Sequence, residues 1–165
     1  MLSLDKKQFL KSASDGANFI PLAKSWPADL ETPLTTWLKV GNDSPPGVLL
    51  ESVEGGESIG RWSVVATDPL WVVTVRGSEL TRSWRDGRSE KFFGNPFDIL
   101  RRMLEPYKSV SLPDLPQLGQ LFGMWGYELI QWIENKVPIY EISDKDLPDG
   151  IWMFMDKLLI FDQVK

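Results

Sequence analysis

A strand, a glycine-bearing loop and a second strand occupy the stretch from Val48 to Pro69, and this pattern constrains the fold more than any other part of the chain. The first apolar run ends at Leu50, and the second, from Ile59 to Ala66, is rich in β-branched and aromatic residues. Pro69 ends the second run because proline has no N–H to donate to a β-ladder. The sequence therefore predicts a hairpin around which the rest of the chain is organised.

Polar groups are expected to meet at the loop end of this hairpin. Glu51 and Ser52 end the first strand. Gly60, Arg61 and Trp62 begin the second strand. Together they would supply a carboxylate, a hydroxyl, a guanidinium, backbone groups and an indole face, which suit a small zwitterion or an anion. Two structural interpretations remain open, since such residues also form solvated turns and the intervening Gly-Gly pair also forms flexible corners.

Composition excludes several kinds of chemistry. The 165 residues include no cysteine and no histidine, which excludes disulfides, thiolate nucleophiles, Cys/His zinc sites and imidazole catalysis. This is evidence against an independent hydrolase or redox enzyme. Asp144, Asp146 and Asp149 lack the spacing of a calcium-binding loop, so we interpret them as solvated carboxylates and predict no metal site.

Charge and hydropathy bear on partners and location. The net charge is −5, and no run of basic residues is longer than two, so nucleic acid and anionic membranes are not expected to bind. The chain shows no secretory signal and no apolar segment near the roughly 20 residues that span a bilayer, which favours a cytoplasmic protein. Its length fits one domain, residues 1–165, and its eight Trp and eight Phe predict a core of large rings.

Capping residues and apolar periodicity predict three helices. The first runs from Ser3 to Ser12. The second has Thr32 as its N-cap, Pro33 at its first position, and Gly41 in a left-handed conformation at its end. The third begins after Asn95, with Arg101 and Arg102 on its wet face. The residues expected to form the apolar stripes are Leu4, Phe9, Leu10, Leu34, Trp37, Leu38, Phe97, Leu100, Met103 and Leu104.

The remaining segments predict a largely antiparallel β-structure. Strands at 70–75, 80–84 and 89–93 continue the first hairpin as a meander, with Trp71 and Trp84 in packed positions. A strand at 118–124 leads into a helix at 125–134, where Gly123 and Gly126 allow close backbone approach and Tyr127 is packed. Segments 151–154 and 158–161 are expected to pair as a hairpin. The fold class is therefore α+β, with antiparallel sheets forming a sandwich-like core and several covering helices.

Motifs along almost the whole chain resemble one family in the same order. They are Phe19–Leu22, Asp29–Pro33, Leu49–Ser52, Glu54–Glu57, Gly60–Ser63, Asp68-Pro69, Gly123–Tyr127 and Phe154–Asp162. On these motifs the chain resembles the N-terminal domain of anthranilate synthase component I, in the wider family that includes aminodeoxychorismate synthase component I.

The resemblance implies a parent enzyme that converts chorismate and ammonia to anthranilate and pyruvate, with Mg²⁺ required. A glutamine amidotransferase subunit would supply the ammonia. The chorismate and metal residues of the family lie in a C-terminal chorismate-binding domain absent from this chain, which ends just after an apolar strand whose edge a neighbour is expected to cover. The resemblance therefore implies a fragment with no catalytic residue and no cofactor of its own.

The resemblance also implies an L-tryptophan feedback site. Carried over by position, Ser52 contacts the amino-acid head group and Glu51 orients the ammonium. Ile59, Gly60, Arg61 and Trp62 supply backbone groups and a wall for the indole. Trp62 and Ala66-Thr67 stand where anthranilate synthases commonly have Tyr and Gly-Ala, which keeps an aminodeoxychorismate synthase parent open. A stand-alone amino-acid-binding module and a docking surface for the amidotransferase are further alternatives.

Overall fold

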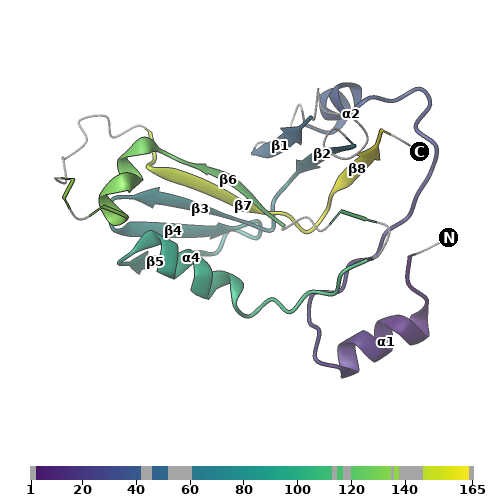
Figure 1. The fold of residues 1–165 in the computed structure, drawn as a ribbon, viewed down its shortest axis with the longest axis horizontal. Helices are drawn as coiled ribbons and strands as arrows, with labels where there is room; N and C mark the ends of the chain where they lie inside the picture. The colour runs from purple at the N-terminus through teal and green to yellow at the C-terminus, as the bar shows by residue number, and fades with distance from the viewer. Residues whose placement is uncertain are drawn as a thin grey trace. The chain divides into compact units, whose positions relative to one another are not determined.

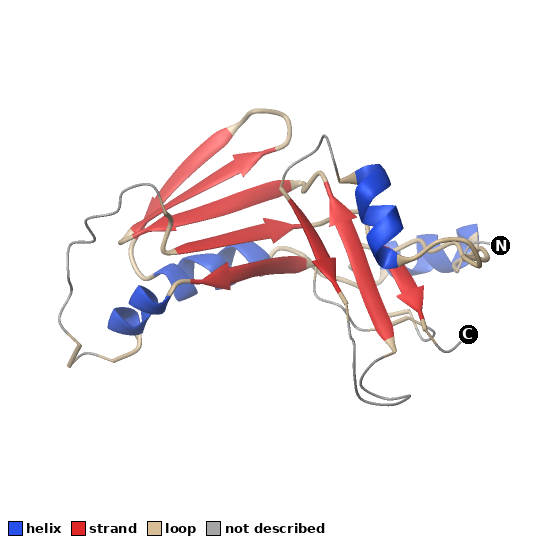
Figure 2. Ribbon diagram, turned by 90° about the horizontal axis from the view of Figure 1, so that it is seen from above, coloured by secondary structure: helices blue, strands red, loops and turns tan. Residues whose placement is uncertain are grey.

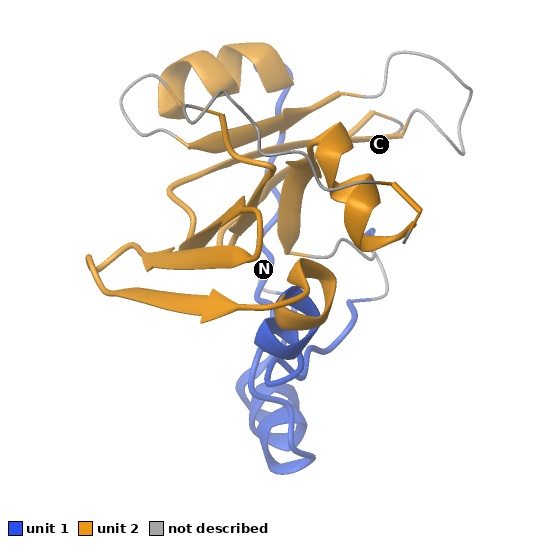
Figure 3. Ribbon diagram, turned by 90° about the vertical axis from the view of Figure 1, so that its left-hand side faces the viewer, with its two compact units in different colours: residues 1–31, 100–118 blue, residues 32–99, 119–165 orange. Residues whose placement is uncertain are grey.

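The structure is a computed structural model that describes residues 3–41, 46–51, 61–112, 115–116, 120–134, 136–137 and 147–163. The chain divides into two compact units, which Figure 3 colours separately. Unit 1 comprises residues 1–31 and 100–118, and unit 2 comprises residues 32–99 and 119–165.

Unit 1 contains helix α1, Lys6–Ser14, and a contact between two distant segments. The predicted N-terminal helix is confirmed, but it begins later than expected because Asp5 and Gln8 form a capping box. The side chain of Asn18 accepts a hydrogen bond from the Lys108 backbone N–H and donates one to the Pro106 carbonyl, both at 2.7 Å. These bonds hold the extended segment that follows α1 against the segment that follows α4.

Helix α2, Pro33–Val40, begins as predicted at Thr32, whose hydroxyl accepts from the Thr35 N–H at 3.0 Å. The left-handed conformation predicted for Gly41 is wrong, since its φ is −97°. Glycine suits this position for a steric reason, because a Cβ would lie 2.8 Å from the Trp37 carbonyl oxygen. The Trp37 ring also lies against Gly47, where an added Cβ would be 2.7 Å from it. Trp37 thus packs α2 onto the sheet that contains Gly47.

Unit 2 contains two antiparallel sheets (Figures 1 and 2). The three-stranded sheet has the order β1-β2-β8, and its strands are Gly47–Leu50, Trp62–Thr67 and Leu159–Asp162. The five-stranded sheet has the order β5-β4-β3-β7-β6. Its strands are β3 (Trp71–Arg76), β4 (Glu79–Trp84), β5 (Ser89–Phe93), β6 (Leu121–Trp125) and β7 (Gly150–Phe154). The predicted first hairpin is confirmed, with Val48 opposite Ala66 and Leu50 opposite Val64.

Two predicted connections are wrong. Strands β2 and β3 do not continue one meander, because they belong to different sheets. Strands β7 and β8 do not form a hairpin: β7 pairs with β3 and β6, whereas β8 pairs with β2 (Figure 1). Apolar strand patterns do not specify partners, so local sequence could not distinguish a turn within a sheet from a change of sheet. At the first change of sheet, Asp68 has a positive φ of 57°.

A network of four charged side chains joins the two changes of sheet. Arg85 Nε lies 2.9 Å from Asp68, and Arg85 Nη2 lies 2.6 Å from Asp156. Lys157 Nζ donates to the second oxygen of Asp68 at 2.9 Å. The hydrogen bond from Lys157 lowers the pKa of Asp68, and the hydrogen bond to Asp156 raises the pKa of Arg85. We name this group the crossover network, since it ties the chain after β2 to the chain after β7.

Large rings form the core of the five-stranded sheet, as predicted. Trp71 is fully buried and stacks on Phe154 with ring centroids 4.8 Å apart, and Trp84 contacts Trp71 edge-on at 6.4 Å. Helix α4, Pro96–Leu104, starts at the predicted cap, where Asn95 Oδ1 accepts from the Phe97 N–H at 3.0 Å. The Phe97 ring lies 5.0 Å from that of Trp125, so the first turn of α4 packs against the sheet.

A second buried cluster joins the two sheets of unit 2. It consists of Val48, Ala66, Met153 and Met155, with Val72, Phe122 and Leu158 packed against it. Val48 and Ala66 come from the three-stranded sheet, and Met153 comes from the five-stranded sheet. The α+β class with antiparallel sheets is therefore confirmed, and shared apolar packing gives the sheets a sandwich-like core.

The segment after β6 differs in two respects from the prediction. It forms a 3₁₀-helix, η1 (Tyr127–Trp132), and Tyr127 is 82% exposed rather than packed. The close approach at Gly123 and Gly126 is confirmed, because a Cβ at either would meet backbone atoms of the adjacent segment, residues 149–152.

Asp149 is buried and accepts a hydrogen bond from the Gly77 N–H, so its interpretation as a solvated carboxylate is wrong. Asp144 and Asp146 lie outside the described residues. In the described ranges, every helix is too short or too polar to span a bilayer.

Candidate functional site

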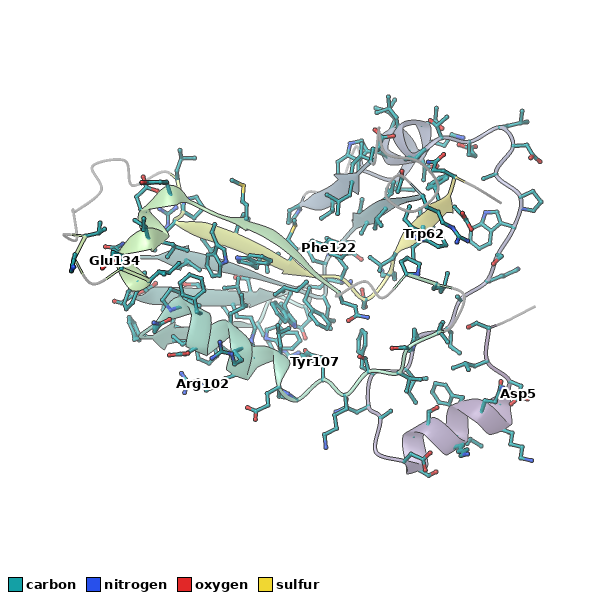
Figure 4. The ribbon with its side chains drawn as sticks, viewed as in Figure 1. Asp5, Trp62, Arg102, Tyr107, Phe122 and Glu134 are labelled. Atoms are coloured by element: carbon teal, nitrogen blue, oxygen red, sulfur yellow. The ribbon has the colours of Figure 1, made fainter. Side chains whose placement is uncertain are left out.

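Three strand ends meet at one end of the three-stranded sheet. Strand β1 ends at Leu50 and is followed by Glu51, while β2 begins directly after Arg61. Strand β8 ends at Asp162, which pairs with Trp62. Because both neighbours of β2 run antiparallel to it, their final residues lie beside its first ones. We name Glu51, Arg61, Trp62 and Asp162 the strand-end cluster (Figure 4 labels Trp62).

The cluster contains three of the six residues that the sequence placed in a binding site. Glu51 is exposed, whereas Arg61 and Trp62 are half-buried. Ser52, Ile59 and Gly60 lie outside the described residues. The antiparallel pairing thus brings Glu51 to the same end of the sheet as Arg61 and Trp62, which is the arrangement expected of a hairpin.

Asp162 fixes the guanidinium of Arg61. Arg61 Nε donates to Asp162 Oδ1 at 2.9 Å, and Arg61 Nη2 donates to Asp162 Oδ2 at 2.8 Å. The same guanidinium lies over the Trp62 ring, 4.4 Å from its centroid. The hydrogen bonding to Asp162 raises the pKa of Arg61. Such a two-point pair defines both the position and the plane of the guanidinium.

Two further side chains secure this end of the sheet. The Gln163 backbone N–H donates to the Arg61 carbonyl at 2.8 Å. The Gln163 side chain donates to the Ser63 hydroxyl at 3.2 Å, and Ser63 is 1% exposed. The last residues of the described chain are therefore hydrogen-bonded to the residues on both sides of Trp62.

Sequence reasoning missed Asp162 as a member of the cluster and Gln163 as its neighbour. Asp162 is 101 positions from Arg61, and no spacing rule connects two residues so far apart. The apolar run of β8 was visible in the sequence, but its pairing with β2 was not. Only that pairing indicates that an acidic residue at the end of β8 meets the arginine before β2.

The charges and the aromatic ring of the cluster suit the binding of a small zwitterion. It offers a fixed guanidinium for a carboxylate, an exposed carboxylate for an ammonium, and the indole of Trp62 for a ring. Within the described ranges, no group of three or more Asp, Glu, His or Cys residues has an arrangement that could hold a metal ion.

Comparison with known proteins relates the whole chain to one kind of enzyme subunit. It is 55% identical over 166 aligned residues to anthranilate synthase component 1 of Synechocystis sp., which covers 100% of this chain and 32% of that protein. It is 35% identical to anthranilate synthase component 1 of Acetivibrio thermocellus, over 90% of this chain and 30% of that protein. The chain thus spans about a third of the length of these relatives.

A solved structure gives a weaker match, and the protein-family models give none. A crystal structure of anthranilate synthase component I from Streptococcus pneumoniae TIGR4 matches 86% of this chain and 29% of that one, at 22% identity and a TM-score of 0.49. No protein-family model matches the sequence.

Proposed function

We propose that this chain is the N-terminal, tryptophan-binding regulatory region of an anthranilate synthase component 1 protein, of which it spans about a third. The observation that carries the proposal is the 55% identity to the Synechocystis protein over the whole chain. The parent enzyme would convert chorismate and ammonia, derived from glutamine, to anthranilate and pyruvate. This region would regulate that carbon–oxygen lyase reaction and perform none of its chemistry.

The strand-end cluster supports L-tryptophan as the effector. An amino acid carries one carboxylate and one ammonium about two bonds apart, so its site needs a cation and an anion close together. Arg61 and Glu51 supply these charges at one end of the sheet, and Trp62 supplies an aromatic surface for the indole. The exposure of Glu51 and the half-exposure of Arg61 leave both groups accessible to a ligand.

Feedback inhibition requires a second part of the protein. It is a coupling free energy between the effector site and the active site, so tryptophan must bind one arrangement of the enzyme more tightly than another. The partners in this proposal are a chorismate-binding domain, which would use Mg²⁺, and a glutamine amidotransferase subunit. Residues of the chorismate-binding domain would complete the effector site, so this region alone would bind tryptophan weakly.

Inhibition of the full-length enzyme by L-tryptophan tests the proposal. Ser52→Arg is expected to shift the inhibition curve to higher tryptophan, because a long cation would occupy the space of the amino-acid head group. The matched control is Ser89→Arg, an exposed serine on β5 of the other sheet, for which the curve should stay in place. Anthranilate fluorescence gives the rate. The same inhibition curve for Ser52→Arg and wild type would reject the assigned site.

One alternative parent has a specific observation in its favour. Trp62 and Ala66-Thr67 depart from the Tyr and Gly-Ala that anthranilate synthases commonly show, as aminodeoxychorismate synthases also do in this region. Product analysis of the full-length enzyme separates the two parents. Release of anthranilate and pyruvate supports the proposal, and accumulation of aminodeoxychorismate supports the alternative.

A further inference from the structure

The Arg61 side chain is fixed on two sides before any ligand arrives. Asp162 binds one edge of its guanidinium through two hydrogen bonds, and the Trp62 ring lies against one face. The Arg61 backbone is fixed as well, since its carbonyl accepts from the Gln163 N–H. An arginine side chain is among those with the most rotamer freedom to lose. Restraining it in the free protein therefore lowers the conformational entropy that is lost when a ligand binds.

The fixed guanidinium keeps donors for a second anion. Arginine has five N–H donors in a planar fork, and the two bonds to Asp162 use Nε and one N–H of Nη2. Among the residues that the structure describes, Asp162 is the acceptor bound to this guanidinium, so the edge formed by Nη1 and Nη2 remains for a ligand, and 31% of the Arg61 side chain is exposed. That edge has the spacing of the two oxygens of a carboxylate.

We propose that Asp162 is a positioning residue of the effector site, holding Arg61 so that its remaining edge receives the α-carboxylate of the amino acid. The inference rests on the proposed function and adds a residue to its site. Asp162 makes no contact with the ligand and acts through Arg61. By ordering that side chain in the free protein, it removes an ordering cost that would otherwise fall on ligand binding.

The negative charge of Asp162 repels the ligand carboxylate only weakly, so it offsets little of the binding free energy that the ordering of Arg61 contributes. It and the ligand carboxylate would lie on different edges of one guanidinium, with the positive charge between them. Asp162 and Arg61 are also both partly exposed, at 20% and 31%, so solvent screens the repulsion. The ordering of Arg61 therefore outweighs this repulsion, and loss of Asp162 should weaken ligand binding.

Calorimetry on the full-length enzyme tests the inference with two ligands. L-Tryptophan carries the carboxylate, and tryptophanamide keeps the ammonium and the indole without it. Asp162→Asn should weaken L-tryptophan binding by about three- to tenfold, the range expected for ordering one long side chain, and leave tryptophanamide within about twofold. Asp86→Asn is the matched control, because it breaks an Asp–Arg pair in the β4–β5 turn and should change neither affinity.

A double-mutant cycle gives a readout that a structural role would not produce. Arg61→Gln should weaken L-tryptophan binding, and adding Asp162→Asn to Arg61→Gln should cause no further loss. Asp162 would then act only through Arg61.

The outcomes separate the inference from the proposed function. Tighter L-tryptophan binding by Asp162→Asn would show that Asp162 competes with the ligand, and an equal loss for both ligands would show a structural role. Independent losses in the cycle, or an unchanged affinity in Asp162→Asn, would also overturn the inference while leaving the proposed function intact. A wild-type enzyme that binds neither ligand would refute the proposed function itself.

Discussion

Replacing Gly123 by alanine is expected to break the pairing of β6 with β7. A Cβ at Gly123 would lie 2.2 Å from the Ile151 carbonyl oxygen and 2.7 Å from the Trp152 Cα, whereas such contacts are essentially never seen below 3.0 Å. Both atoms belong to the backbone of the paired strand. A change of rotamer therefore cannot relieve the clash, and the strands must move apart.

The size of the effect follows from which atoms collide. Overpacking a core usually costs about 1–3 kcal/mol, and flexible side chains absorb much of the strain. Because the obstacle here is backbone, we expect at least about 3 kcal/mol of lost stability. For a protein of this size, that loss corresponds to a decrease in Tm of about 6–12 °C.

Thermal unfolding followed by circular dichroism measures this effect against a matched control. Gly87→Ala makes the same chemical change in an open turn, where φ is +89° and no atom lies within 4 Å of the added Cβ. It should cost about 1–2 kcal/mol through backbone strain alone. Hydrogen exchange should also accelerate in β6 and β7 more than in the β3–β4 pair. A Gly123→Ala variant as stable as Gly87→Ala would refute the steric argument.

The crossover network and the helix cap give three further predictions. Arg85→Met should lower the free energy of unfolding by about 1–2 kcal/mol, since it leaves Asp156 without its cation, and urea denaturation measures this loss. The pKa of Asp68 is below its ordinary value of 3.8, so its stabilising contribution is present above that pH and disappears as the pH falls through the lower folded-state value. The Tm difference between wild type and Asp68→Asn should therefore shrink below about pH 4, and a constant difference from pH 7 to pH 3 would contradict this. Asn95→Ala should cost about 1 kcal/mol by removing the N-cap of α4, whereas Asn95→Asp should retain most stability in the same urea titration.

Local features were predictable because neighbouring residues determine them. Thr32 before Pro33 and Asn95 before Pro96 marked two helix starts, since a cap needs only a side-chain acceptor within one turn. The turn at 86–87 set the β4–β5 hairpin in the same way. The left-handed conformation predicted for Gly41 was wrong. Glycine is required there because Trp37 leaves no room for a Cβ, and not because the chain makes a left-handed turn.

The candidate site was predictable to the extent that one hairpin builds it. The pairing of β1 with β2 brings Glu51 to the same end of the sheet as Arg61 and Trp62, and two apolar runs on either side of a glycine-bearing loop indicated that pairing. The state of Arg61 was not predictable. Its guanidinium is held by Asp162, and that contact exists only because β8 pairs with β2.

The sequence by itself determined the helix caps, most strand segments and the excluded chemistry, because each depends on residue types within a few positions or on composition. The tertiary structure decided how the strands are divided between two sheets, where the chain crosses between them, and which carboxylate fixes Arg61. These outcomes depend on which apolar faces are buried together, and many partners suit an apolar strand equally well in local terms. The free energy that selects among them comes from packing residues far apart in the chain, such as Ala66 with Met153.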